Sequence, residues 1–230
     1  MSNIEKYLNS EEGYIKITPE IKELAEKITD GAETDAEKAE KIYNYMRDIN
    51  YFISPSMPAP NLIDRKFLDC GSKHTLQASL LRASGIPARI NLMECPLEAV
   101  SKTVDHIRLP RMGRVVLGTA LSAIGEDVNY GTHYALDAYY DDDWHFQDST
   151  VPPQLCNYFT GEKKADCLSK KNASALLGCR KIGHTKDLPS NGVIVSVMGK
   201  LAVDYMEKLG LGVDDAFIEK ANSGESKQGI

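Results

Sequence analysis

Apolar residues recur at helical spacing in two stretches near the start of the chain, with polar residues between them. The first stretch begins at Thr18 and Pro19, a common helix start with proline in the first helical position, and its apolar positions are Ile21, Leu24, Ala25 and Ile28. The second begins at Thr34, where Glu37 completes a capping-box pattern, and its apolar positions are Ala39, Ile42, Tyr43, Met46 and Ile49. We therefore predict two amphipathic helices that end near residues 29 and 50.

A third helix is predicted within the stretch Leu68–Arg89, LDCGSKHTLQASLLRASGIPAR. Residues 75–83 are mostly good helix formers, with leucines close to a helical spacing. Gly85 and Pro87 end the helix, as a glycine after the last turn and a proline just beyond it usually do. The strand-like residues 88–93 follow directly, so this stretch reads as a helix, a sharp stop and a strand.

Cys70 lies at or just before the first turn of this third helix. Unpaired backbone N–H groups and the positive end of the helix dipole point at its sulfur there. That setting favours the thiolate, which is the nucleophilic form. Lys73, one turn further on, can add positive charge. The alternative is that Cys70 is a small buried apolar residue, because free cysteine is among the most buried residue types.

Two later segments alternate in the way that half-buried strands do. Residues 132–140 are rich in aromatics and end in the acidic turn Asp141–Asp143, and residues 144–148 return from it. This spacing predicts a β-hairpin. Because side chains alternate between the two faces of a strand, His133 shares a face with Ala135 and Asp137, and Asp148 shares a face with Trp144.

The remaining segments carry weaker patterns. The proline-rich residues 54–60 cannot form a regular helix or a central strand, and we expect them to form one wall of a site around Cys70. Residues 97–107 favour a short amphipathic helix, and residues 111–130 an insertion that lies over another part of the protein. Residues 151–192 look irregular and polar, and residues 193–209 return to a helical period.

The hairpin and the third helix together suggest nucleophilic catalysis. Cys70 stands at a helix start, His133 begins one strand of the hairpin and Asp148 ends the other. In a tight hairpin the two strand ends lie side by side, so the carboxylate can hold the imidazole and the imidazole can face the sulfur. The three residues would then act as nucleophile, base and orienting group. We predict no metal and no cofactor for this chemistry.

Composition and charge exclude several other classes of protein. The 230 residues, 42% of them hydrophobic, are enough for a single core, and the net charge of −6 argues against a nucleic-acid partner. No apolar run approaches the roughly 18 residues that cross a membrane. The first residues form no apolar signal segment, and the five cysteines are an odd number. We therefore expect reduced thiols and a cytoplasmic protein. No feature of the sequence indicates the oligomeric state.

The chain resembles the transglutaminase-like superfamily, whose cysteine enzymes share a papain-like core. The family pattern is a cysteine at a helix start, then a leucine-rich helix that ends in ALLRAxGIPAR, and here Cys70 is followed by SLLRASGIPAR. The family then has H-x-x-x-E-x-Y, a turn and W-x-x-x-D-x-T, which are matched here by His133, Asp137, Tyr139, Trp144, Asp148 and Thr150. The resemblance implies an α+β fold in which the helix of Cys70 packs on an antiparallel sheet. It covers about residues 35–155 of a single domain, 1–230, with a C-terminal extension over residues 156–230.

The resemblance implies attack of the Cys70 thiolate on an amide carbonyl of a peptide or protein, with a thioester intermediate. If water is the second nucleophile, the protein is a protease or amidase. We prefer this reading because no feature of the sequence indicates a second tunnel that would direct an amine to the site. If a lysine amine takes that place, the protein is a transglutaminase. A non-catalytic binding module on the same fold is the third reading. An oxyanion hole needs a donor besides the Cys70 N–H, and Tyr51 and Gln154 are the candidates.

Other titratable residues have structural interpretations beside the functional ones. His74 can share a helix face with Cys70 and is interpreted as a wall or core residue, whereas His106 is interpreted as solvated. The acidic turn is interpreted as a charged turn rather than a calcium site. A zinc set is not favoured, because the close cysteine pair of structural zinc sites is missing among Cys156, Cys167, Cys179 and His184. Unrelated thiols are the simpler interpretation of these cysteines, and a disulfide is the alternative if the protein is exported.

Overall fold

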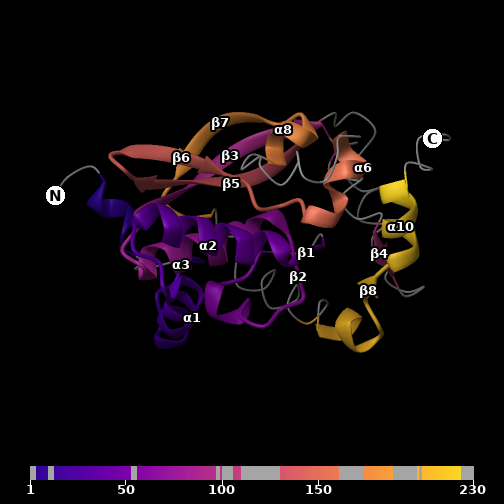
Figure 1. Ribbon diagram of the computed structural model, residues 1–230, viewed down its shortest axis with the longest axis horizontal. Helices are drawn as coiled ribbons and strands as arrows, with labels where there is room; N and C mark the ends of the chain where they lie inside the picture. Colours follow the sequence, from indigo (N-terminus) through magenta and orange to yellow (C-terminus); the bar gives the residue numbers. More distant parts are fainter. Residues whose placement is uncertain are drawn as a thin grey trace.

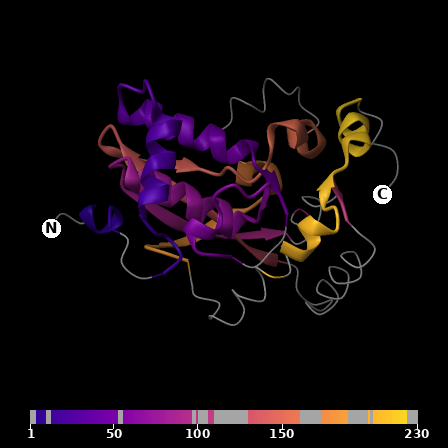
Figure 2. The same ribbon diagram turned by 90° about the horizontal axis from the view of Figure 1, so that it is seen from below.

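The computed structural model describes residues 4–9, 13–52, 56–96, 99, 106–109, 130–160, 173–188, 201 and 204–223. Three helices, α1 (Pro19–Thr29), α2 (Asp35–Asp48) and α3 (Cys70–Ala83), lie together on one face of a four-stranded sheet (Figures 1 and 2). The sheet order is β6-β5-β3-β7, and all its pairs are antiparallel. The protein is therefore an α+β fold of the predicted kind, with the helix of Cys70 packed on an antiparallel sheet.

The predicted caps form at the first two helices. The Thr18 side chain accepts a hydrogen bond from the Ile21 N–H, and Pro19 is the first residue of α1. Thr34 and Glu37 make both bonds of the capping box at the start of α2. These bonds satisfy backbone N–H groups that have no partner inside the helix. Both helix starts are thus fixed locally, as the sequence predicts.

Helix α3 is the central element of the core. Each of its residues from Cys70 to Arg82 is buried, because α1 and α2 cover one side of it and β3 and β5 the other. Its end at Ala83 is followed by Gly85 in the left-handed region, with φ +84°, which a glycine adopts without strain. The Arg82 guanidinium donates to the carbonyls of Asn9, Ala88 and Lys186. Arg82 therefore joins the end of the helix to three separate segments.

The sheet consists of β3 (Ala88–Pro96), β5 (Tyr130–Tyr140), β6 (Asp143–Gln147) and β7 (Arg180–Thr185). The hairpin β5–β6 has the predicted place, but its turn is shorter than predicted, since Asp143 already belongs to β6. Asp141 and Asp142 form the turn with φ of 51° and 62°, which aspartate tolerates better than most residues. The register pairs Leu136 with Gln147. Extended by one residue, it brings Asp148 opposite Ala135, next to His133 on the same face.

Shorter elements complete the described part of the chain. Strands β1 (Asn50–Tyr51) and β2 (Phe67–Leu68) form a parallel pair that leads into α3, and β4 (Ile107–Arg108) pairs with β8 (Gly212–Val213). The other elements are η1 (Glu5–Tyr7), η2 (Ala59–Asn61), η3 (Pro153–Leu155), α6 (Cys156–Thr160), α8 (Ala173–Leu177) and α10 (Asp215–Ser223). A small core of Phe52, Phe67, Ile107, Leu109 and Leu211 joins the β4–β8 pair to the β1–β2 pair.

Two secondary-structure predictions are wrong. Ile107, placed on a helix by its spacing, belongs to β4. The segment predicted to be irregular contains β7, whose sequence RKIGHT carries no alternating pattern because five of its side chains are exposed or half-buried at the edge of the sheet and none is buried. The predicted insertion over residues 111–130 and the predicted helix over residues 193–209 lie mostly outside the described residues. Among the residues described, no helix has the length and apolar character needed to cross a membrane.

Candidate active site

Cys70 is the first residue of α3, and the N-cap before it is Asp69. The Asp69 carboxylate accepts a hydrogen bond of 2.7 Å from the Ser72 N–H, which fixes the first turn of the helix around the cysteine. Burial raises the pKa of Asp69 to about 6, although hydrogen bonds from Ser72 and Ser56 act in the opposite direction. Cys70 itself is 9% exposed. Cys70 therefore lies at the predicted helix start and keeps only a small exposed fraction.

The proline-rich segment contributes to the wall of this site, as predicted, through Ser56. The Ser56 Oγ lies 3.5 Å from an oxygen of Asp69. The Ser56 Oγ also lies next to Gly71, where an added Cβ would come within 2.2 Å of the Ser56 Oγ. Gly71 is thus required for the close approach of this segment to the first turn of α3. Residues 54 and 55 of the segment lie outside the described residues.

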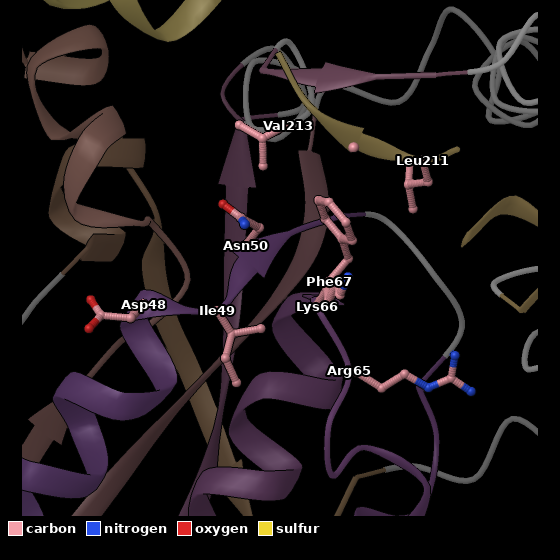
Figure 3. Close-up of a pocket in the computed structure, with 9 residues that line it drawn as sticks. Asp48, Ile49, Asn50, Arg65, Lys66, Phe67, Leu211 and Val213 are labelled. Carbon is pink, nitrogen blue, oxygen red and sulfur yellow. The ribbon is translucent and has the colours of Figure 1, made fainter. Parts of the chain in front are cut away.

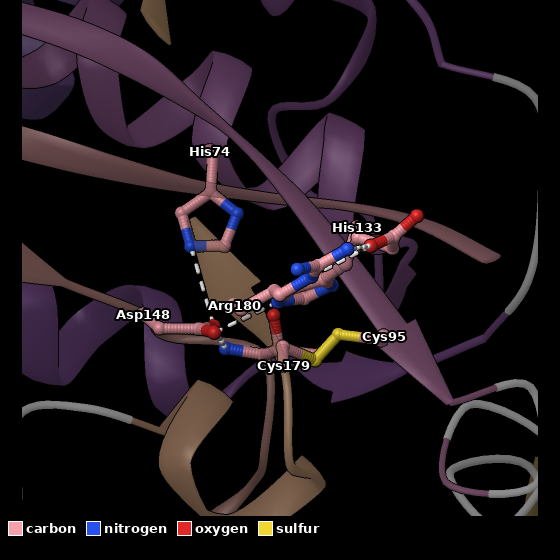
Figure 4. The surroundings of a disulfide bond; sticks show 8 residues. His74, Cys95, His133, Asp148, Cys179 and Arg180 are labelled. Atoms are coloured by element: carbon pink, nitrogen blue, oxygen red, sulfur yellow. Dashed lines mark hydrogen bonds and ion pairs between the residues drawn. A yellow bond between two sulfur atoms is a disulfide. The ribbon is translucent and has the colours of Figure 1, made fainter. Parts of the chain in front are cut away.

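His133, on β5, donates through Nε2 to Asp148 Oδ2 at 2.7 Å, and both side chains are buried. Figure 4 shows the two side chains pointing toward each other. The Cys70 side chain lies close enough to the His133 imidazole to act on its pKa. Because Asp148 takes Nε2, Nδ1 is the ring nitrogen left for the sulfur. The structure therefore brings together all three residues that the sequence singled out, in the order sulfur, imidazole, carboxylate.

The electrostatics of Cys70, His133 and Asp148 favour a charged imidazole at His133. Burial on its own lowers the pKa of His133, but the charges of Asp148 and Cys70, with hydrogen bonds to both, raise it to about 10. Burial acts to raise the pKa of Asp148, but the His133 charge and hydrogen bond hold it well below its usual range. The Asp148 carboxylate is held further by the Thr150 N–H, at 3.0 Å from Oδ1. An imidazolium beside a sulfur is the arrangement that supports a thiolate.

Lys73 does not act as the sequence suggests. Its Nζ donates to the carbonyls of Ser149, at 2.9 Å, and Thr150, at 3.3 Å, and its side chain is fully buried. Burial lowers the pKa of Lys73 to about 7, against the attraction of Asp148. Lys73 is therefore a buried link between α3 and the segment that follows Asp148, rather than a positive charge directed at the sulfur.

His74 is buried, as its interpretation as a core residue requires, but it is also part of the site. Its Nδ1 lies 2.7 Å from the Cys70 carbonyl oxygen, and its Nε2 lies 3.2 Å from the Ser149 nitrogen and 3.6 Å from Asp148 Oδ1. Burial lowers the pKa of His74 to about 4, against the attraction of Asp148. The contact with Asp148 is therefore not an ion pair. Sequence spacing placed His74 on the right face, but nothing in the sequence revealed Ser149 as its partner.

Neither predicted oxyanion donor is identified by its contacts. Tyr51 is buried in β1, and the Gln154 side chain donates to Asn50 Oδ1 at 3.0 Å. Both therefore stay predictions.

Next to Asn50, a cavity of about 430 Å³ opens between β1, β2 and the β8 segment, and Figure 3 shows its lining. Its Arg65 is held by ion pairs to Asp204 and Glu207.

Several cysteines and histidines differ from their sequence interpretation. Cys95, on β3, forms a disulfide with Cys179, which comes just before β7, so the prediction of reduced thiols is wrong for this pair. Figure 4 shows this disulfide among the side chains of the site. Cys179 is also unavailable to the zinc set, whose Cys167 lies outside the described residues. His106 is fully buried rather than solvated.

Comparisons with known proteins agree with this architecture. The family model of the Transglutaminase-like superfamily matches residues 22–144, more than half of the chain, and this range includes Cys70 and His133. A search of curated proteins found no match. A putative cysteine protease from Cytophaga hutchinsonii has a similar structure, with a TM-score of 0.51 and 17% identity over 81% of this chain.

This chain corresponds to 48% of the Cytophaga protein, or about half of its length. A second solved structure, a putative protease from Parabacteroides distasonis, has a TM-score of 0.38 and 16% identity, over 66% of this chain and 26% of its own. At 17% identity, the likeness to the Cytophaga protein shows the fold alone. The family match over more than half of the sequence, together with the fold, shows that the chain belongs to the transglutaminase-like superfamily.

Proposed function

We propose that this protein is a cysteine-dependent hydrolase of amide bonds, with Cys70 as nucleophile, His133 as acid and base, and Asp148 as the orienting group. The observation that carries the proposal is the buried His133–Asp148 hydrogen bond, with the Cys70 side chain close enough to the same imidazole to act on its pKa. The raised pKa of His133, about 10, means that the imidazole carries its proton at neutral pH. An imidazolium next to the sulfur favours the thiolate form, which nucleophilic catalysis by cysteine requires.

The geometry supports a two-step reaction. The Cys70 thiolate attacks the carbonyl carbon of a peptide or protein amide, and the Cys70 N–H, at the start of α3, can donate to the oxyanion that forms. The C–N bond breaks as His133 gives its Nδ1 proton to the leaving amine. Neutral His133 then takes a proton from water, whose oxygen attacks the thioester carbonyl. Release of the acid returns the thiolate and the imidazolium.

The test compares two buried free cysteines of the described chain, Cys70 and Cys156. Peptide amides are incubated with the protein, and free acid and amine are measured by mass spectrometry. Cys70→Ala should abolish turnover and leave the circular dichroism spectrum unchanged, whereas Cys156→Ala should keep both. Full turnover in Cys70→Ala would refute the proposal.

A labelled primary amine in the same mixture separates hydrolysis from amine transfer. Release of free acid without label on the acyl product supports hydrolysis. Incorporation of the label supports the transglutaminase alternative, since the thioester is common to both reactions. No turnover, together with alkylation of Cys70 by iodoacetamide no faster than that of Cys156, would favour a binding module instead. Cytoplasmic location and the single-domain organisation stay predictions.

A further inference from the structure

His74 has a defined partner at each ring nitrogen. It lies one turn after Cys70 on α3 and is fully buried. Its Nδ1 is 2.7 Å from the Cys70 carbonyl oxygen, and its Nε2 is 3.2 Å from the backbone nitrogen of Ser149. One side chain therefore joins the backbone of the nucleophile to the residue that follows Asp148.

The chemistry of these partners determines the tautomer. A carbonyl oxygen can only accept a hydrogen bond, so Nδ1 must carry the proton. The Ser149 N–H can only donate, so Nε2 must offer its lone pair. Both bonds form together only in the neutral ring, and the low pKa of His74, about 4, agrees with this because burial disfavours the charged form. Burial and the charges of His133 and Lys73 lower the pKa of His74 against the charge of Asp148, which acts to raise it, so the ring stays neutral.

Ser149, which follows Asp148, is bonded to side chains of α3 through both its backbone N–H and its backbone carbonyl. His74 accepts from the Ser149 N–H, and Lys73 donates to the Ser149 carbonyl at 2.9 Å. The Gln77 side chain, one turn further along α3, accepts from the Ser149 hydroxyl at 2.8 Å. Asp148 precedes this clamped residue directly, and its Oδ2 holds His133. The place of the carboxylate therefore depends on the bonds made at Ser149.

We propose that His74, in its neutral Nδ1–H form, is a positioning residue that joins the turn of Cys70 to the backbone beside Asp148. Its role in turnover rests on the hydrolysis proposed above. His74 contacts no reacting atom, and it acts through the placement of Asp148 and hence of His133. Misplacement of a catalytic group by about 1 Å can cost about 10²-fold in rate, which sets the effect to expect.

The experiment uses three substitutions of His74 and one control. His74→Phe keeps a ring and removes both bonds. His74→Gln can reach Ser149 with its amide oxygen, and His74→Asn is long enough to reach only the Cys70 carbonyl. Thr75→Val alters a buried residue at the next position of α3 without removing any contact to Ser149. The readouts are kcat and KM for the amide substrate and the pKa of His133, from NMR of isotope-labelled histidine.

The proposal expects a folded His74→Phe with kcat lowered by about 10²-fold, KM little changed and a lower His133 pKa. His74→Gln should recover more activity than His74→Asn, and Thr75→Val should behave as the wild type. Wild-type kcat in folded His74→Phe would overturn the proposal. So would equal recovery by Gln and Asn, or an Nε2–H tautomer of His74 in the wild-type NMR spectrum.

Three measurements need neither a substrate nor a folded His74→Phe. The tautomer of His74 is measured in the wild type, and the rate of Cys70 alkylation and the His133 pKa are measured in each folded variant. If the wild type hydrolyses no amide, the proposed function fails, but slower alkylation and a lower His133 pKa in His74→Gln or His74→Asn would still support the positioning role. Unchanged values in both variants would end it.

Discussion

The buried ammonium of Lys73 should change how the stability of the protein depends on pH. Its Nζ is surrounded by backbone carbonyls, those of Ser149, Thr150 and, at 3.5 Å, Arg47. Burial lowers the pKa to about 7, against the attraction of Asp148 and Asp48. In the unfolded chain the same amine titrates near its usual value of about 10.4. The substitution Lys73→Met tests the consequence for stability.

The sign of the effect follows from counting bound protons. Between about pH 7 and 10 the unfolded chain keeps the Lys73 proton and the folded chain has lost it, so this residue makes the protein more stable as the pH rises. His133 acts in the opposite sense. Its folded pKa is raised to about 10, so its contribution is complete below about pH 6.5 and is lost as the pH rises towards 10. Each group contributes a slope of about 1.4 kcal/mol per pH unit, and the two slopes nearly cancel in the wild type.

Lys73→Met removes only the rising contribution. Between about pH 7.5 and 9.5, the free energy of unfolding of Lys73→Met should therefore fall by about 3 kcal/mol relative to that of the wild type. Urea unfolding at several pH values measures it, followed by the fluorescence of the single tryptophan, Trp144. Lys22→Met, on the exposed face of α1, is the control and should run parallel to the wild type. Parallel curves for Lys73→Met and the wild type would show that folded Lys73 stays protonated, and the reasoning would be wrong.

Three further predictions concern the surroundings of the site. Gly71→Ala places a Cβ 2.2 Å from the Ser56 Oγ, so thermal unfolding should show a loss of about 1–3 kcal/mol; an unchanged melting temperature would contradict it. Asp148→Asn removes the charge that raises the His133 pKa, so that pKa should fall in an NMR titration and kcat should drop by about 10²-fold or more. Cys95→Ser opens the disulfide to Cys179, which should cost about 2–4 kcal/mol in thermal unfolding without reductant, while equal stability with and without reductant in the wild type would refute it.

The sequence predicted the elements whose signals are local. The capping box at Thr34, the stop at Gly85 and the hairpin around the acidic turn are each encoded by neighbouring residues. Each of them forms, although the hairpin turn is shorter than predicted. The grouping of Cys70, His133 and Asp148 followed from the same local signals, because a helix start and two strand ends leave little freedom in a compact fold. The structure places His133 and Asp148 within hydrogen-bond distance, and the catalytic roles of the three residues stay a prediction.

The missed features depend on contacts between distant residues. Strand β7 shows no alternation because it is an edge strand with much of its surface exposed, and its pairing with β3 is set by the other strands. The disulfide from Cys95 to Cys179 joins cysteines 84 residues apart, and spacing alone does not determine such a pairing. The direction of the Lys73 side chain depends on the Ser149 carbonyl, which belongs to another element. Such partners are not visible in a local pattern.

The two histidines of the site show why partners, and not residue type or burial, decide the chemistry. His74 and His133 are both buried, with rings 6.3 Å apart, and burial alone lowers the pKa of each. His133 has a carboxylate at 2.7 Å, which stabilises the imidazolium, whereas His74 has the Ser149 N–H at its lone pair, which requires the neutral ring. Because His74 stays neutral, the carboxylate of Asp148 can stabilise the charged form of His133 alone. Both rings lie near Asp148, but the carboxylate is 2.7 Å from His133 and 3.6 Å from His74. The pKa of His133 is therefore raised, whereas burial lowers the pKa of His74.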